Sequence, residues 1–268
     1  MNAIKRSIVT IPLLGPLAQS VYRFLYRLTV YKFREAVPGT YDPPSRWIAS
    51  LLADRELDVV QIGSNDGATN DPIASLIEVN NRWRVIFVEP VPYLFESLKR
   101  NKGNQNRFRF ENVALNNGTA QTFYSVQVTA KDHIPNLPPW YNQLGSFNRS
   151  NITRQLNGIL EPFIQECKIA GITLTELLER NQVKALELLH LDTEGYDWKI
   201  LSNLNLARYK PSVILFEHKL LSRTEMRDST NFLRPWYNLY RLGIDTLCVR
   251  KDIVTIDNTQ SLKGTLVG

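Results

Sequence analysis

The sequence predicts an α/β domain built on a mainly parallel β-sheet, and three observations support this prediction. Short β-branched segments alternate with helical segments from residue 57 onward. A glycine turn, Gly63–Gly67, follows the first strand, and the acidic residue Glu89 closes the second. Two further strand segments near the end of the chain have the spacing of an antiparallel hairpin. This pattern implies a parallel sheet with helices on both faces and one antiparallel edge.

The size and composition of the chain are those of a globular protein. With 268 residues and 43% apolar content, it can bury a full core. We expect an N-terminal helical extension and linker over residues 1–45, and the main domain over residues 46–268 with a substrate-side insertion at 116–163. Two cysteines are too few for a disulfide framework and lack metal-site spacing, so we expect a cytoplasmic protein.

Residues 17–34 have the apolar periodicity of an amphipathic helix that also carries Arg23 and Arg27. Such a basic, aromatic helix suits an anionic membrane surface, and packing over the domain or against a partner subunit is the alternative interpretation. The apolar stretch before it contains Pro12 and Pro16 and is shorter than the roughly 20 residues that span a bilayer. Peripheral membrane contact and oligomerisation are both compatible with this pattern.

The first half of the main domain follows the alternation closely. Leu57–Ile62 is a short β-branched run, as expected for a strand buried on both faces. Asp71-Pro72 is a good helix start, and the apolar Ile73 and Ile77 then point inward. The elements expected next are a strand at Arg84–Glu89, a helix from Pro92 through Leu98, and a strand at Phe108–Val113.

Residues 116–163 depart from this alternation. Thr122–Val128 has the composition of an extra strand, and a long irregular segment follows it. Loops of this length in a compact domain are usually functional or disordered. Trp140, Tyr141 and Phe147 can form an aromatic lid over an acceptor, and packing of the loop against the domain is the alternative interpretation.

Regular elements return after residue 163. Thr173-Leu-Thr-Glu176 is a capping box that starts a helix through Arg180. Leu186–Asp192 and Ser212–Glu217 are the fourth and fifth strands of the predicted sheet. The remaining expected elements are a helix from about Tyr196 to Leu204, a last helix ending near Gly243, and a terminal hairpin of Ile244–Val249 with Ile253–Ile256.

The glycine turn helps to choose between nucleoside cofactors. A dinucleotide fingerprint needs glycines at the first, third and sixth positions of Gly-x-Gly-x-x-Gly. Here Asn65 stands at the second glycine position, and the sequence has no phosphate-loop lysine. A Gly-x-x-x-Gly turn suits a ligand without phosphates, such as S-adenosylmethionine, whose ribose hydroxyls Glu89 can bind. A purely structural turn is the alternative interpretation.

The net charge of +6 raises the question of an anionic partner. Much of the excess is local, and the basic run between Lys99 and Arg109 lacks the interleaved aromatic residues of a single-strand binding platform. A solvated helix end and loop explain this run more simply. We therefore do not expect a nucleic-acid partner, although an RNA methyltransferase remains an alternative.

Several motifs carry a resemblance to a known family. They are Val60-Gln61-Ile62-Gly63-Ser64-Asn65-Asp66-Gly67, Val88-Glu89-Pro90, Asn112-Val113-Ala114-Leu115, Ile172-Thr173-Leu174, Leu191-Asp192-Thr193-Glu194-Gly195 and Ile214-Leu215-Phe216-Glu217-His218. In this order they resemble the FkbM-type S-adenosylmethionine-dependent methyltransferases over roughly residues 57–250. The resemblance implies a Rossmann-like class I methyltransferase sheet and methyl transfer to a hydroxyl of a sugar, glycan or polyketide-like small molecule.

Candidate site residues follow from these strand ends, because ligands of open α/β sheets sit beyond the carboxyl ends of the strands. We assign Gly63, Ser64, Asn65 and Gly67 to the methionine end of the cofactor, Glu89 to the ribose and Asn112 to the adenine edge. Asp192 is the first candidate for the catalytic base and His218 the second. The candidate substrate contacts are Glu194, Glu217, Trp140 and Tyr141.

Other functions remain open at this point. A nucleotide (NAD)-dependent oxidoreductase shares the strand, turn and acid pattern. A non-catalytic domain that binds a partner through the N-terminal helix is a further alternative. Asp192, Glu194, Glu217 and His218 could also form an oxygen-rich metal site, but their spacing does not require one, so we assign no metal.

Overall fold

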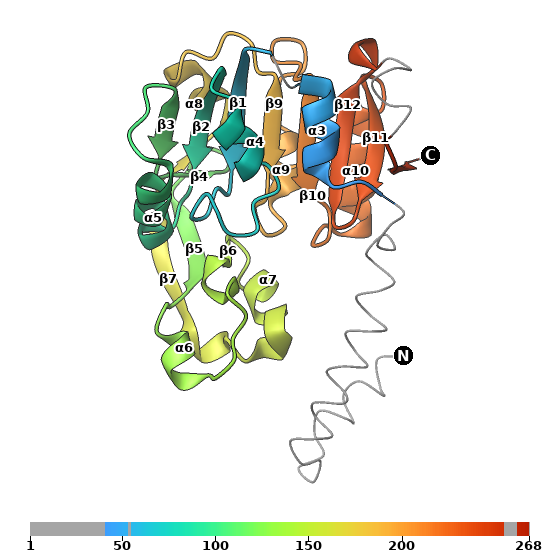
Figure 1. The fold of residues 1–268 in the computed structure, drawn as a ribbon. Helices are drawn as coiled ribbons and strands as arrows, with labels where there is room; N and C mark the ends of the chain where they lie inside the picture. The colour runs from blue at the N-terminus through green and yellow to red at the C-terminus, as the bar shows by residue number, and fades with distance from the viewer. Residues whose placement is uncertain (1–40, 53–54, 255–261, 268) are drawn as a thin grey trace.

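The computed structural model describes residues 41–52, 55–254 and 262–267. Within them, a central eight-stranded sheet has the order β13-β11-β12-β10-β9-β1-β2-β3 (Figure 1). The predicted helix at 17–34 lies outside the described residues. The strands of this sheet are β1 (Leu57–Ile62), β2 (Trp83–Val88), β3 (Phe108–Glu111), β9 (Leu188–Leu191), β10 (Val213–Glu217), β11 (Tyr237–Leu242), β12 (Asp245–Arg250) and β13 (Thr265–Leu266).

The sheet confirms the predicted fold class. Strand β1 pairs in parallel with β2 on one side and with β9 on the other, β3 extends the first branch, and β10 extends the second. Strand β12 pairs antiparallel with β10, and β11 pairs antiparallel with β12. After β1 the chain forms β2 and β3 on one side of it and later forms β9 and β10 on the other side. Because the strand order reverses at β1, a crevice opens between the carboxyl ends of β1 and β9.

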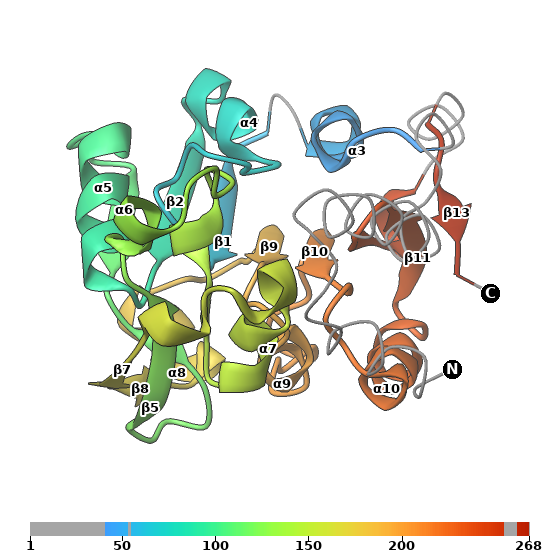
Figure 2. The same cartoon turned by 90° about the horizontal axis from the view of Figure 1, so that it is seen from below.

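Helices cover both faces of the sheet (Figure 2). Val59 faces a cluster with α3 (Pro44–Leu52), α4 (Ala74–Val79) and α5 (Pro92–Lys102), and the predicted inward residues of α4 are buried there. Val60 faces the opposite cluster. Successive side chains of a strand point to opposite faces, so a continuous apolar run builds two cores at once. The helices of the second face are α8 (Leu174–Arg180), α9 (Asp197–Leu201) and α10 (Arg223–Leu233).

The C-terminal hairpin exists, and the predicted strand Ile244–Val249 corresponds to β12, but its partner is β11, which precedes it, and not the predicted Ile253–Ile256. Helix α10 ends at Leu233, and Gly243, expected to cap it, has φ +70° in the turn between β11 and β12. Tyr237–Leu242 largely alternates buried and more exposed side chains, a strand period that the sequence interpretation assigned to a helix. Lys251–Ile253, expected to lead into the second hairpin strand, forms a 3₁₀ turn instead.

Residues 116–163 contribute most of a separate lobe beside the carboxyl end of β3 (Figure 1). Strands β5 (Gln121–Val126), β6 (Gly145–Ser146) and β7 (Ile164–Ile169) form a three-stranded antiparallel sheet there. Val126, Leu144 and Leu160 belong to a small apolar core of this lobe. Its other elements are α6 (Ala130–His133), α7 (Arg149–Thr153) and 3₁₀ turns at Tyr141–Gln143, Gln155–Gly158 and Glu161–Phe163, and the pair β4 (Ala114–Leu115) with β8 (Gly171–Ile172) connects the lobe to the domain.

None of the helices in the described part of the chain combines the length and apolar character that crossing a membrane requires.

Candidate functional site

The glycine turn after β1 packs directly against the loop after β9. The backbone amides of Gly63 and Ser64 both donate to the carbonyl of Val88, at 3.0 Å each. Gly63 has φ +79°, and a Cβ atom on it would lie 1.8 Å from the carbonyl oxygen of Asp192. Any side chain at this position would separate the two loops, so glycine is required by close approach as well as by conformation.

Ser64 and Gly67 hold the turn together and do not line the pocket described below. The Ser64 hydroxyl donates to the carbonyl of Gln61 at 2.9 Å and accepts from the amide of Val88 at 3.1 Å, which ties β1 to β2. A Cβ atom on Gly67 would lie 2.5 Å from the side chain of Leu98 on α5. Both residues therefore shape the turn, and their direct contact with a ligand remains a prediction.

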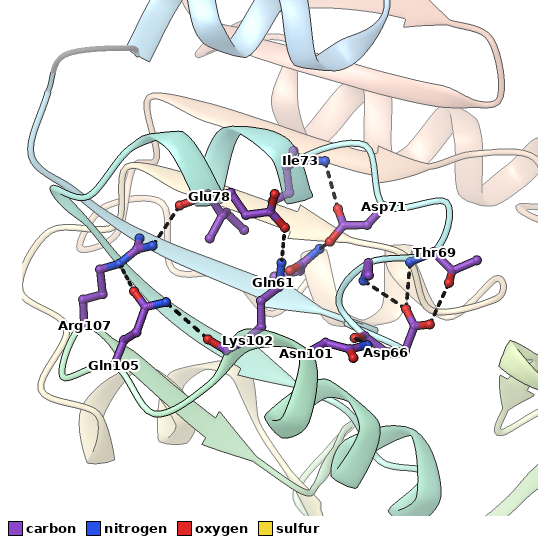
Figure 3. Close-up of polar contacts among 12 residues, drawn as sticks. Gln61, Asp66, Thr69, Asp71, Ile73, Glu78, Asn101, Lys102, Gln105 and Arg107 are labelled. Carbon is purple, nitrogen blue, oxygen red and sulfur yellow. Dashed lines mark hydrogen bonds and ion pairs between the residues drawn. The ribbon is translucent and has the colours of Figure 1, made fainter.

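The far side of the turn is anchored to α5 and β1 (Figure 3). The carboxylate of Asp66 accepts from the amide of Thr69 at 2.8 Å, and the Asn101 side chain donates to the Asp66 carbonyl at 2.8 Å. Gln61 donates to the carboxylate of Asp71 at 2.9 Å. These bonds preorganise the backbone that carries Gly63 and Asn65.

A pocket of about 500 Å³, measured to its open mouth, lies in the crevice beyond β1 and β9. Its walls come from four segments: the glycine turn, the end of β2 with Glu89, the loop after β9, and the insertion. The residues that line it are Ile62, Gly63, Asn65, Val88, Glu89, Pro90, Val113, Ala114, Leu115, Phe123, Gln143, Gly145, Phe147, Asp192, Thr193, Glu194, Tyr196 and Ile200.

Glu89 is fixed at the inner wall of this pocket. Its side chain is 3% exposed, and its two oxygens accept from the backbone amides of Asn65 at 2.9 Å and Val91 at 2.8 Å. The pKa of Glu89 is raised to about 7 in total. Burial is the largest cause and nearby Asp192 adds to it, while the two hydrogen bonds act in the opposite direction. Each oxygen keeps a second lone-pair direction with which to accept from a ligand hydroxyl.

Asn112 lies next to the pocket but does not line it. Its side-chain amide donates to the backbone carbonyls of Glu89 at 2.8 Å and Pro90 at 3.1 Å, so it steadies the segment that carries the acid. The following residues Val113 and Ala114 do line the pocket. The structure thus places backbone and apolar side chains where the sequence pattern suggested an amide.

Several carboxyl groups gather beyond the end of β9. Asp192 and Glu194 line the pocket, while Asp197, Glu217 and Asp245 lie outside its lining. Burial raises the pKa of all five, to about 8 for Glu194 and about 7 for Asp197, and Asp192 further raises the pKa of the other four. Carboxylates crowded in this way resist simultaneous ionisation, so this edge of the sheet holds protons near neutral pH.

The insertion clamps the loop that carries Glu194. The Glu194 carbonyl accepts from the Asn151 side chain at 2.7 Å and from the Ser146 hydroxyl at 3.2 Å. Glu194 itself has φ +52°, and a Cβ atom on Gly195 would lie 2.7 Å from the Asn151 amide nitrogen. On the other side, Tyr93 of α5 donates to the backbone carbonyl of Asn142. Asn151 and Ser146 were not predicted, because their partner is a backbone atom more than 40 residues away.

The histidines lie away from the pocket lining. His218, the second candidate base, pairs its Nδ1 with the Thr246 hydroxyl at 3.0 Å, and burial together with Arg241 lowers its pKa to about 4. His190 is buried in β9, where its Nδ1 lies 3.2 Å from the Gln61 amide nitrogen, and burial lowers its pKa. The structure therefore does not pair His218 with Asp192.

The aromatic wall of the pocket differs from the predicted lid. Phe147 lines the pocket and packs between Phe123, at 5.1 Å between ring centroids, and Tyr196, at 4.8 Å. Trp140 and Tyr141 instead pack in the core of the insertion, where the Tyr141 hydroxyl donates to the Val128 carbonyl. The sequence could not distinguish Phe147 from Trp140 and Tyr141, because the tertiary packing of the insertion decides which aromatic residues face the domain.

Among the residues described, no group of three or more His, Cys, Asp or Glu side chains has the arrangement of a metal site.

The first prediction concerns the contact between Gly63 and Asp192. We expect Gly63→Ala to lower the free energy of unfolding by at least about 3 kcal/mol, because the new methyl group overlaps the Asp192 carbonyl. Gly118→Ala is the matched control, with a similar φ of +86° and a nearest neighbour at 3.5 Å, and should cost about 1–2 kcal/mol. Chemical denaturation measures both values, and equal costs would contradict the close-approach argument.

The second prediction concerns pH. A carboxyl group whose pKa is raised from 4.5 to about 7 by folding binds more protons in the native state between those values. The stability of the ligand-free protein should therefore fall as pH rises from about 5 to 8, with Glu89 contributing up to about 3 kcal/mol. Glu89→Gln should flatten this slope in pH-dependent denaturation, while Glu166→Gln on the exposed face of β7 should not. A slope that Glu89→Gln leaves unchanged would refute the assignment.

A known protein family matches more than half of this chain. The sequence profile of the Methyltransferase FkbM domain matches residues 61–242, which include the glycine turn, Glu89 and the acidic loop. Among solved structures, a chain of a crystal structure of a fibrillarin/Nop5p complex is similar with a TM-score of 0.38 and 11% identity, over 76% of this chain and 82% of that one. No curated protein sequence matches significantly. The chain belongs to the FkbM methyltransferase domain family and is a methyltransferase.

Proposed function

We propose that this protein transfers a methyl group from S-adenosylmethionine to a hydroxyl of a glycan or other small-molecule acceptor. The observation that carries the proposal is the position of Glu89, whose buried carboxylate faces the same pocket as Gly63 and Asn65. Bound in this pocket, S-adenosylmethionine would supply an electrophilic methyl group on a sulfonium.

The pocket suits an adenosyl group in shape and chemistry. It is open to solvent and has both apolar and acidic walls, as a small-molecule site requires. Glu89 offers one acceptor direction on each oxygen for the two ribose hydroxyls, and Val113 with Leu115 provides an apolar surface for the adenine. Gly63 and Asn65 would then lie beside the methionine end.

The charge of the site argues against phosphate-bearing ligands. Glu89, Asp192 and Glu194 line a single pocket whose described lining contains no lysine or arginine, so a pyrophosphate or an RNA backbone would find no cation to pair with there. The positive net charge of the whole chain therefore does not indicate which ligands this pocket binds. A nicotinamide dinucleotide and an RNA acceptor are both disfavoured on this ground.

Asp192 is our candidate for the catalytic base. It lines the pocket, and burial raises its pKa, which makes it a better proton acceptor than an exposed carboxylate. In a displacement at a sulfonium methyl group, positioning the acceptor oxygen supplies much of the catalysis. Removal of the hydroxyl proton by Asp192 would add roughly 10²- to 10⁴-fold.

The insertion is proposed to form the acceptor side of the site. Phe147 and Gly145 reach the pocket from this lobe, and Asn151 fixes the backbone of Glu194. An apolar ring beside acidic side chains suits a sugar-like acceptor, which has apolar faces and polar edges. We propose cytoplasmic action, and membrane contact through residues 17–34 stays a prediction about residues that the structure does not describe.

Calorimetry tests the cofactor assignment. We expect S-adenosylhomocysteine to bind the full-length protein with micromolar affinity or better, and NADH to show no saturable binding, because the described lining of the pocket has no lysine or arginine to pair with its pyrophosphate. Tight NADH binding together with no S-adenosylhomocysteine binding would end this proposal.

A pair of substitutions tests the division of roles. Glu89→Gln should weaken S-adenosylhomocysteine binding at least tenfold, because the amide loses one acceptor oxygen at the ribose. Asp192→Asn should change this affinity less than threefold and instead lower methyl transfer to an acceptor by roughly 10²-fold or more. Calorimetry and methyl transfer from radiolabelled donor to a glycan panel supply the two readouts. Equal loss of binding in both variants would show that the roles are not divided in this way.

A further inference from the structure

Part of the acidic cluster has no role in the donor site. Glu217 ends β10 and pairs in register with Asp245 at the start of β12, while Asp197 begins α9. Strands β10 and β12 lie on the far side of β9 from β1 and β2, which carry the glycine turn and Glu89. Glu217 and Asp245 therefore lie on the half of the sheet edge away from the ribose position.

Two of these groups keep a buried oxygen without a hydrogen-bond partner. Glu217 is 6% exposed and its Oε2 is unpartnered, and Asp197 is fully buried with an unpartnered Oδ1. The other Asp197 oxygen accepts from the Thr193 hydroxyl at 3.0 Å. Burial of a carboxylate oxygen without a partner is costly, so such atoms in a native fold call for a ligand or another explanation.

The unpartnered Glu217 lies next to the pocket wall. Phe216 pairs in register with Leu191, so Glu217 and the pocket-lining Asp192 stand side by side at the ends of β10 and β9. Asp192, Glu194 and Asp197 each raise the pKa of Glu217 through their charge, so all of these carboxyl groups lie close to it. Lys219 lowers the pKa of Glu217 and of Asp192, but this single ammonium stands against five carboxyl groups. The cluster therefore has more carboxyl groups than nearby ammonium groups, and it holds protons that a bound cation would displace.

The chemistry of methyl transfer limits which cation the cluster can serve. The positive charge of a sulfonium is lost in the transition state, so carboxylates placed to hold it would stabilise the reactant more than the transition state. A cation carried by the acceptor keeps its charge throughout the reaction and imposes no such penalty. The described carboxyl groups also lack a metal-site arrangement. An organic ammonium fits these constraints best.

We propose that Asp192, Glu194 and Glu217 form a subsite for an ammonium group on the acceptor, so that the substrate is an amine-bearing alcohol such as an amino sugar. This inference rests on the proposed methyltransferase function and names its acceptor class. Glu217 binds the ammonium, and Glu194 links this position to the pocket. The acceptor hydroxyl then lies within reach of Asp192, and Phe147 and Tyr196 pack against the carbon skeleton.

Matched pairs of probes test the subsite. Ligand-observed NMR titrations at pH 7 and low ionic strength compare ethanolamine with ethylene glycol, and glucosamine with glucose, on the full-length protein with and without S-adenosylhomocysteine. We expect each amine to bind at least tenfold more tightly than its neutral partner. Glu217→Gln should reduce this preference to threefold or less, whereas the control Glu166→Gln should leave it unchanged.

A second variant protects the test against a folding defect. Asp245→Asn removes a carboxyl group from the same cluster and should weaken amine binding in the same direction. Thermal unfolding and S-adenosylhomocysteine affinity, both expected to stay close to those of the unsubstituted protein, establish that each variant is folded.

Three results separate the possible failures. Equal binding of amines and neutral partners, with S-adenosylhomocysteine still bound, overturns the ammonium subsite and leaves the methyltransferase proposal standing. Displacement of ethanolamine by submillimolar Mg²⁺ would identify a metal site and also overturn the inference. An amine preference that Glu217→Gln removes, in a protein that binds no S-adenosylhomocysteine, would support the subsite and refute the proposed cofactor.

Discussion

The close approach of Gly63 to the carbonyl of Asp192 is the constraint on which the site depends. It brings the turn after β1 and the loop after β9 into backbone contact, with no room for a side chain between them. Glu89 is then bonded to the amide of Asn65 in that same turn. The ribose candidate and the candidate base are thus both attached to the same turn. Preorganisation of this kind is what a displacement reaction needs from its protein.

The crowding of carboxyl groups is the second constraint, and the insertion makes it possible. Asn151 and Ser146 bond to the Glu194 carbonyl and hold a non-glycine residue at φ +52°. A backbone conformation of this kind persists only where the surroundings enforce it. The lobe therefore does more than cover the pocket, because it positions one of the acids that give the pocket its charge.

Local pattern predicted the parallel half of the fold well and the antiparallel edge poorly. Leu57–Ile62 matched β1 to the residue, because the apolar and β-branched residues that dominate it are typical of a strand buried on both faces. Tyr237–Leu242 was predicted to be helical, since a half-buried antiparallel strand has a weaker apolar signature than a strand buried on both faces. At the site, motif positions located Gly63, Glu89 and Asp192 at one pocket. They could not show that Ser64 and Asn112 bond to backbone instead, or that Phe147 packs between Phe123 and Tyr196, because both depend on tertiary packing.

The net charge of the chain and the charge of its site have opposite signs, and this difference bears on the acceptor. Electrostatic interaction falls off with distance and is screened by salt, so surface lysines and arginines far from the pocket contribute little inside it. Within the cluster, Lys219 is a single cation facing Asp192, Glu194 and Glu217. An anionic acceptor would add a further negative charge to a site that already resists ionisation. A hydroxyl of a neutral acceptor can donate to the unpartnered oxygen of Glu217, but it brings no charge to offset the crowding, whereas a cationic acceptor would permit the carboxyl groups to ionise and pair.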